Sequence, residues 1–128
     1  MSSSTRKKLI VTCICLAVAA MHLLTGPNYR GPFRPFVTGY LIDIVLPFAL
    51  VLLFGLAADE MRWGSRPVLR WALVFGIGAS VEICQFLGIP LFGKTFDPID
   101  FLAYAGGAGL GLLFETRVFF GSPPSQCA

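Results

Sequence analysis

Charged residues are scarce in this chain. Only 13% of its 128 residues are Asp, Glu, Lys or Arg, whereas 55% are hydrophobic. A typical soluble domain carries about 25% charged residues, because its surface must face water. The shortage argues against an ordinary soluble fold and indicates that the lipid bilayer is the solvent.

A continuous basic stripe is also missing. Ten basic and seven acidic residues leave a formal net charge of +3, and the basic residues form short clusters between apolar runs. Nucleic-acid-binding proteins instead gather Lys and Arg on one face, so we expect no nucleic-acid partner. Basic residues that flank apolar runs serve orientation, because they stay on the cytoplasmic side during membrane insertion.

Residues for metal or cofactor chemistry are few. The chain has one histidine and four cysteines, and Cys13, Cys15, Cys84 and Cys127 have no metal-type spacing. No serine elbow or phosphate loop is present, and the glycines between 106 and 111 follow no strand, so they indicate helix packing rather than dinucleotide binding. We expect no metal and no cofactor, and the sequence favours a non-enzymatic role without excluding an enzyme.

Four apolar runs predict an all-α fold, a single domain over residues 1–128 that forms an integral membrane bundle of four transmembrane helices. The runs cover about residues 9–24, 37–58, 68–92 and 98–115. At about 1.5 Å per residue, even the shortest approaches the thickness of a hydrocarbon core. Pro47 lies inside the second run and predicts a kink between Ile42 and Pro47.

The first run has two interpretations. Ala17-Val18-Ala19 resembles a signal-peptidase site, so the run could be a cleaved signal peptide. We expect a retained anchor, because removal would leave three helices with an apolar chain start.

The distribution of bases predicts the orientation. Seven basic residues lie in the first tail, the second connector and the end tail, and three lie in the other two loops: Arg30, Arg34 and Lys94. Both termini are therefore expected in the cytoplasm, which predicts a multi-pass protein of the bacterial cytoplasmic membrane.

Polar residues from all four runs fall in the outward half. They are His22, Asp43, Glu82 with Gln85 on one helix face, and Asp97 with Asp100 at the start of the last run. A carboxylate that faces lipid costs at least about 2.5 kcal/mol, so these side chains should point inward, share protons or meet bases. Arg30, Arg34 and Lys94 are the nearest candidate counter-charges. We predict a ligand-binding site of Glu82, Gln85, Lys94, Asp97, Asp100 and Asp43.

Structural explanations stay open for several of these residues. Asp97 followed by Pro98 fits a helix N-cap with proline at the first helical position. Glu82 with Gln85 could be an interhelical hydrogen-bond clamp, and His22 could be a satisfied interfacial residue. Asp100 continues into a stripe of small residues, predicted to pack against another helix: Ala103, Gly107 and Gly111.

The second half of the chain resembles the VanZ-like family of small membrane proteins. The similarity covers about residues 78–112 and rests on Glu82-Ile83-Cys84-Gln85, then Lys94-Thr95-Phe96-Asp97-Pro98-Ile99-Asp100, then Gly107 and Gly111. The family has arginine where this chain has Lys94, and asparagine where it has Tyr104. Lysine lacks the two-pronged hydrogen bonding of arginine, so the family's site is predicted to be altered here.

The resemblance implies an envelope function. Members of the family are associated with low-level teicoplanin resistance, which predicts an outward pocket that binds an envelope lipid or a glycopeptide, with Lys94 as an anion contact. The alternative is an accessory subunit that packs through the glycine stripe against a larger membrane complex or a second copy. A membrane-embedded enzyme or proton-coupled carrier is a third interpretation, and the absence of an internal repeat weighs against a transporter.

Overall fold

The computed structural model describes residues 2–26, 28–58, 61, 66–91 and 96–121, and their regular structure is entirely helical. The elements are α1 (Ser3–Leu24), α2 (Arg34–Phe36), η1 (Val37–Leu41), α3 (Ile42–Ala58), α4 (Pro67–Phe86) and α5 (Pro98–Phe119). Because α2, η1 and α3 follow one another directly, they form one continuous span, Arg34–Ala58. The all-α prediction is confirmed for this part of the chain.

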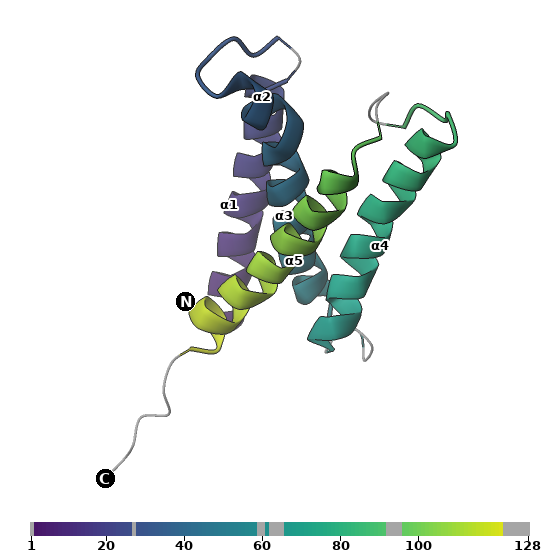
Figure 1. Cartoon of the computed structure of the whole chain (residues 1–128). Coiled ribbons are helices and arrows are strands. Elements are labelled where there is room, and N and C mark those ends of the chain that lie inside the picture. Colours follow the sequence, from purple (N-terminus) through teal and green to yellow (C-terminus); the bar gives the residue numbers. More distant parts are fainter. Residues whose placement is uncertain (1, 27, 59–60, 62–65, 92–95, 122–128) are drawn as a thin grey trace.

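The long helices form a bundle in which α3 is central (Figure 1). It packs against α1, α4 and α5, and α5 also packs against α4. The end of α1, the start of the α2–α3 span, the end of α4 and the start of α5 lie at one end of the bundle. The start of α1 and the end of α5 lie at the other.

The first and last helices are longer than their apolar runs predict. α1 begins at Ser3 rather than near residue 9, because the Ser2 hydroxyl caps it by accepting a hydrogen bond from the Thr5 amide at 3.2 Å. α5 ends at Phe119 rather than near residue 115. Charged residues such as Lys and Glu are good helix formers, so an apolar run understates the helix that contains it.

The second helix contains a π-helical turn. The backbone is irregular over Val37–Leu41, just before the Ile42–Pro47 segment where a kink is predicted. Pro47 itself lies inside α3. Having no N–H, it cannot donate to the carbonyl of Asp43.

α4 ends at Phe86 and not near residue 92. Gly88 adopts a left-handed conformation with φ of 81°, which costs glycine little because it has no Cβ. The amide of Gly88 donates to the Gln85 carbonyl and that of Ile89 to the Cys84 carbonyl, at 3.0 and 2.8 Å. This pattern is a Schellman motif, and it terminates the helix six residues before the apolar run ends.

The core between α3 and α5 depends on small residues. Ala103 is buried, and at Gly107 a Cβ atom would collide with the Ile44 carbonyl of α3. At Gly111 it would meet Val51, and the Phe48 carbonyl at 2.8 Å. The small-residue stripe of α5 therefore lies against α3, whose backbone approaches too closely for a larger side chain.

The outside of the bundle is apolar. Many large hydrophobic side chains are exposed, among them Leu23, Phe33, Val68 and Leu102. Three spans in the described residues are long and apolar enough to cross a membrane: Ser3–Leu24, Arg34–Ala58 and Pro67–Phe86. α5 has the length, at 22 residues, but its glycines and its charged residues make it less apolar.

Candidate functional site

Three helical segments enclose a polar cavity of about 430 Å³ at the end of the bundle where α5 begins. They are the start of the α2–α3 span, the end of α4 and the start of α5, and each has polar side chains in these turns. The described residues that line it are Pro35, Thr38, Gly39, Tyr40, Ile42, Asp43, Val81, Glu82, Gln85, Asp97, Asp100 and Tyr104. Five of the six predicted site residues are brought together here, and Lys94 lies outside the described residues.

Glu82 is the most buried polar residue of the cavity, with 1% of its surface exposed. Its Oε1 accepts a hydrogen bond from the Tyr104 hydroxyl at 3.1 Å, and its Oε2 accepts one from the Asp97 amide at 3.3 Å. Both donors belong to α5 or its cap, so Glu82 joins α4 to α5. A buried carboxylate needs such donors, because an unpaired one loses its hydration without compensation.

Asp97 caps α5, which confirms the structural explanation of this residue. Its Oδ1 accepts from the Ile99 amide at 2.9 Å, and its Oδ2 accepts from the Tyr40 hydroxyl at 2.7 Å. These two donors stabilise the charged form and hold the pKa of Asp97 below its usual value, the Ile99 amide having the larger effect. The bond from Tyr40 also connects η1, near the start of the Arg34–Ala58 span, to the start of α5.

Gln85 does not form an interhelical clamp in the described structure. Its Nε2 donates to the Leu91 carbonyl at 2.9 Å, in the segment that follows its own helix. Its Oε1 is buried and accepts no hydrogen bond from any described residue. The interhelical contact that the sequence assigns to Glu82 with Gln85 is therefore made by Glu82 alone.

Asp43 and Asp100 complete an acidic wall. Asp43 comes from α3 and Asp100 from the first turn of α5, and the carboxyl groups of both lie close enough to Glu82 to interact electrostatically. No Lys, Arg or His is among the described residues that line the cavity. Arg30 and Arg34, two of the predicted counter-charges, do not line it, so within the described structure the cavity is rich in hydrogen-bond acceptors.

Two tyrosines of the site were not predicted as site residues. Tyr40 precedes Asp43 by almost one helical turn, and this spacing is the signal that could have placed it beside the acids. Tyr104 stands out in the sequence only as a departure from the VanZ-like pattern. It is buried, and its ring leaves no room for a Cβ atom at Gly78 of α4.

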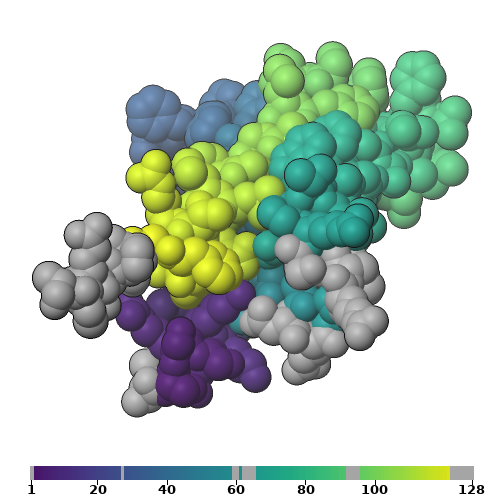
Figure 2. Space-filling view, turned by 90° about the horizontal axis from the view of Figure 1, so that it is seen from below, coloured from purple at the N-terminus to yellow at the C-terminus, as the bar shows by residue number. Residues whose placement is uncertain are grey.

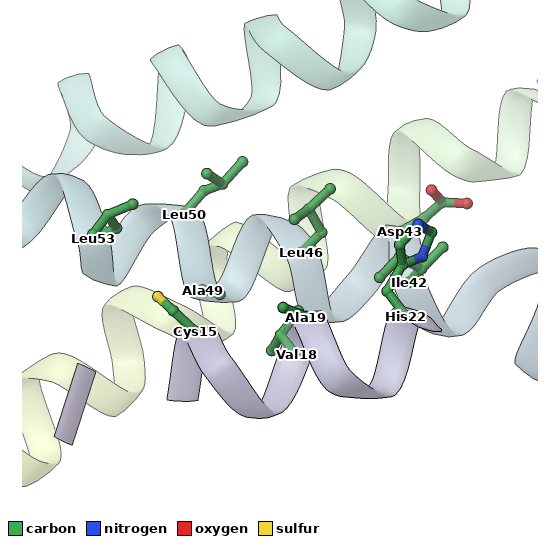
Figure 3. A pocket seen from close by; sticks show the side chains of 10 residues that line it. All are labelled: Cys15, Val18, Ala19, His22, Ile42, Asp43, Leu46, Ala49, Leu50 and Leu53. Atoms are coloured by element: carbon green, nitrogen blue, oxygen red, sulfur yellow. The ribbon is translucent and has the colours of Figure 1, made fainter. Parts of the chain in front are cut away.

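His22 lies apart from the polar cavity. It lines a second, mainly apolar cavity of about 460 Å³ between α1 and α3. Figure 3 shows it at one end of this cavity with Ile42 and Asp43, while Cys15 and Leu53 lie at the other end. The sequence predicted the correct end of the bundle for His22. In the structure, however, His22 does not line the polar cavity.

A second polar cluster lies at the opposite end of the bundle and was not predicted. Nη2 of Arg70 is 2.7 Å from Oε2 of Glu115, and Nζ of Lys7 is 3.3 Å from Oε1 of the same carboxylate. Figure 2 views this end, where the start of α1 meets the end of α5. Arg70, at the edge of the predicted run 68–92, is buried in α4, and Gly55 of α3 leaves room for the pair.

Among the described residues, no three His, Cys, Asp or Glu side chains are grouped so that they could hold a metal ion. Comparison with known proteins adds no further assignment: no family model matches the chain, and no curated protein and no solved structure is significantly similar to it.

Proposed function

We propose that the chain is a VanZ-like, multi-pass protein of the bacterial cytoplasmic membrane in which α5 is a fourth membrane-spanning helix. At about 1.5 Å per residue its 22 residues extend roughly 33 Å, enough for a hydrocarbon core. It packs along α3 and α4, two of the three apolar spans, and exposes Leu102, Leu110 and Leu113. Four crossings place both termini on one side, and the basic residues near them favour the cytoplasm.

The polar cavity then faces outward and binds an envelope lipid or a glycopeptide-type amphiphile through Asp43, Glu82, Gln85, Asp97 and Asp100. Lys94, outside the described residues, stays a predicted contact. The single observation that carries this proposal is the buried Glu82, held by Tyr104 and the Asp97 amide beside a cavity of about 430 Å³. A carboxylate fixed at this depth in a membrane helix is costly, which makes a binding role the default expectation.

The VanZ-like resemblance supports the same residues. Glu82, Gln85, Asp97 and Asp100 are the positions that match the family's pattern, and all four line the cavity. Tyr104, which replaces the family's asparagine, donates to Glu82. The departure from the pattern thus falls on a residue in direct contact with the site.

The test is tolerance to a lipoglycopeptide in a susceptible bacterial host. Cells that express the wild-type chain should tolerate more drug than cells with an empty vector, and Glu82→Gln should remove most of the gain. Ser80→Ala is a matched control, because Ser80 is exposed on the same helix and donates only to the Gly76 carbonyl. Equal tolerance in wild-type and empty-vector cells, at verified expression, would overturn the resistance function.

The accessory-subunit alternative is weaker in one respect. The glycine stripe proposed to contact a partner is already occupied by α3 at Gly107 and Gly111. A partner complex or second copy would have to use other faces of the bundle. Purification in mild detergent separates the two functions, since a stoichiometric larger partner would favour the subunit role.

A further inference from the structure

The cavity between α1 and α3 is mainly apolar: seven of its ten lining residues are aliphatic. The described residues that line it are Cys15, Val18, Ala19, His22, Ile42, Asp43, Leu46, Ala49, Leu50 and Leu53. On α3 the lining positions extend from Ile42 to Leu53, about 16 Å at the helical rise per residue. A cavity of this shape and chemistry fits an alkyl chain that lies along the helices.

The two cavities share a wall. Ile42 and Asp43 line both the apolar cavity and the polar cavity. In Figure 3 the carboxylate of Asp43 lies at the end of the apolar cavity, well away from Leu50 and Leu53. A molecule with its chain along α3 would therefore present its polar end at Asp43.

The polar cavity is suited to a ligand group that donates hydrogen bonds and carries positive charge. Its described lining combines the carboxyl groups of Asp43, Glu82, Asp97 and Asp100 with no basic side chain. A primary ammonium group, with three N–H donors and a positive charge, matches this lining.

We propose that the two cavities form one site for a single-chain amphiphile with a primary ammonium head, whose alkyl chain lies between α1 and α3 beside Ala19 and whose head lies against Asp43. This inference rests on the proposed role of the polar cavity as a ligand site, and it does not depend on drug resistance. An anionic head of the same size would be repelled by the acidic wall.

The probe is an alkylamine with a photoreactive diazirine in its chain, and an alkyl sulfate with the same chain is its anionic counterpart. Irradiation of the purified full chain in detergent, followed by mass spectrometry, locates the labelled residues. The alkylamine should label α1 and α3 at the cavity-lining positions, and the sulfate should label them far less. Equal labelling by both probes, or labelling spread over all outer helix faces, would overturn the proposal.

Two variants test the chain and the head separately. Ala19→Phe fills the apolar cavity and should lower alkylamine labelling by roughly tenfold. This ratio corresponds to a loss of about 1.4 kcal/mol in binding free energy. Ala20→Phe is the matched control, since Ala20 is also exposed on α1 but does not line the cavity. Asp43→Asn should reduce the preference for the amine over the sulfate and leave the labelled positions unchanged. No loss in Ala19→Phe would contradict the chain site.

The inference and the proposed function fail in different ways. If Glu82→Gln abolishes drug tolerance but both probes label alike, the polar cavity keeps its function and the amphiphile site is wrong. If specific alkylamine labelling is found and no strain gains tolerance, the amphiphile site stands and the resistance function is wrong.

Discussion

The hydroxyl of Tyr104 lies 3.1 Å from Oε1 of Glu82, deep between α4 and α5, and donates a hydrogen bond to this carboxylate. The backbone amide of Asp97 donates another, to Oε2. The pair joins α4 to α5, the helix whose first turn contains Asp100 of the acidic wall.

Removal of this hydroxyl should destabilise the fold. In Tyr104→Phe the buried Glu82 loses a donor, which costs about 1–3 kcal/mol for a group left unsatisfied. Thermal unfolding of the purified protein in detergent measures the loss. Tyr29→Phe is the control, because the Tyr29 hydroxyl donates to the Pro32 carbonyl in an exposed loop. Equal melting temperatures for Tyr104→Phe and the wild type would show that Glu82 does not need this donor.

The two adjacent glycines of α5 should respond differently to a methyl group. Gly107→Ala forces α5 away from the Ile44 carbonyl and should cost about 1–3 kcal/mol, as overpacking does. Gly106→Ala meets nothing within 4 Å and replaces glycine in a helix interior, so it should be neutral or slightly stabilising. A comparison of their melting temperatures in detergent tests the close approach of α3 and α5. If both variants behave alike, the contact is not tight.

The Arg70–Glu115 pair should be sensitive to removal of one partner. Both side chains are buried, with 7% and 3% exposed, so Glu115→Gln leaves a buried guanidinium without its carboxylate. Such a loss costs about 3–5 kcal/mol. The double variant Arg70→Met/Glu115→Leu removes both charges of this pair and should recover only part of the stability, because Lys7 also loses its contact with Glu115. Unfolding in detergent provides the readout. A double variant less stable than either single one would contradict this account.

Asp97 should make the stability of the folded protein depend on pH. Its pKa is lowered in the folded protein, so its contribution is present above its ordinary pKa of about 3.9 and disappears as the pH falls through the folded value. Asp97→Asn keeps an oxygen for the Ile99 amide but cannot titrate. The melting temperature of the wild type should therefore exceed that of Asp97→Asn near neutral pH, and the difference should shrink in acid. A difference independent of pH would rule out this role.

The number of crossings can be counted from the ends of the bundle. Ser2→Cys and Phe120→Cys, each in a cysteine-free background, place an exposed thiol at the start of α1 and at the end of α5. Four crossings put both thiols on one side of the membrane, and three put them on opposite sides. Labelling of intact cells with a membrane-impermeant maleimide should leave both unlabelled until the cells are opened. Labelling of Phe120→Cys alone in intact cells would exclude α5 as a membrane span.

Local sequence patterns determined the helices and the capping of the last one. Long apolar runs are readable because bilayer thickness and the helical rise fix their length, and Asp97 with Pro98 marks the start of α5 by local chemistry alone. The predicted end of α4 was less accurate. Apolar residues continue past Phe86, and only the left-handed Gly88 with its Schellman bonds ends the helix there.

The tertiary structure decided which polar residues are partners. Glu82 and Tyr104 are 22 positions apart, Tyr40 and Asp97 are 57 apart, and neither pair has a local signal, because helix rotation and tilt select the contacts. Arg70 and Glu115 lie at the predicted edges of two apolar runs, where charged residues usually face water. Sequence alone determined that acids gather at one end of a helical bundle. Packing determined that Glu82 is buried at the polar cavity, and that Asp43 also borders an apolar one.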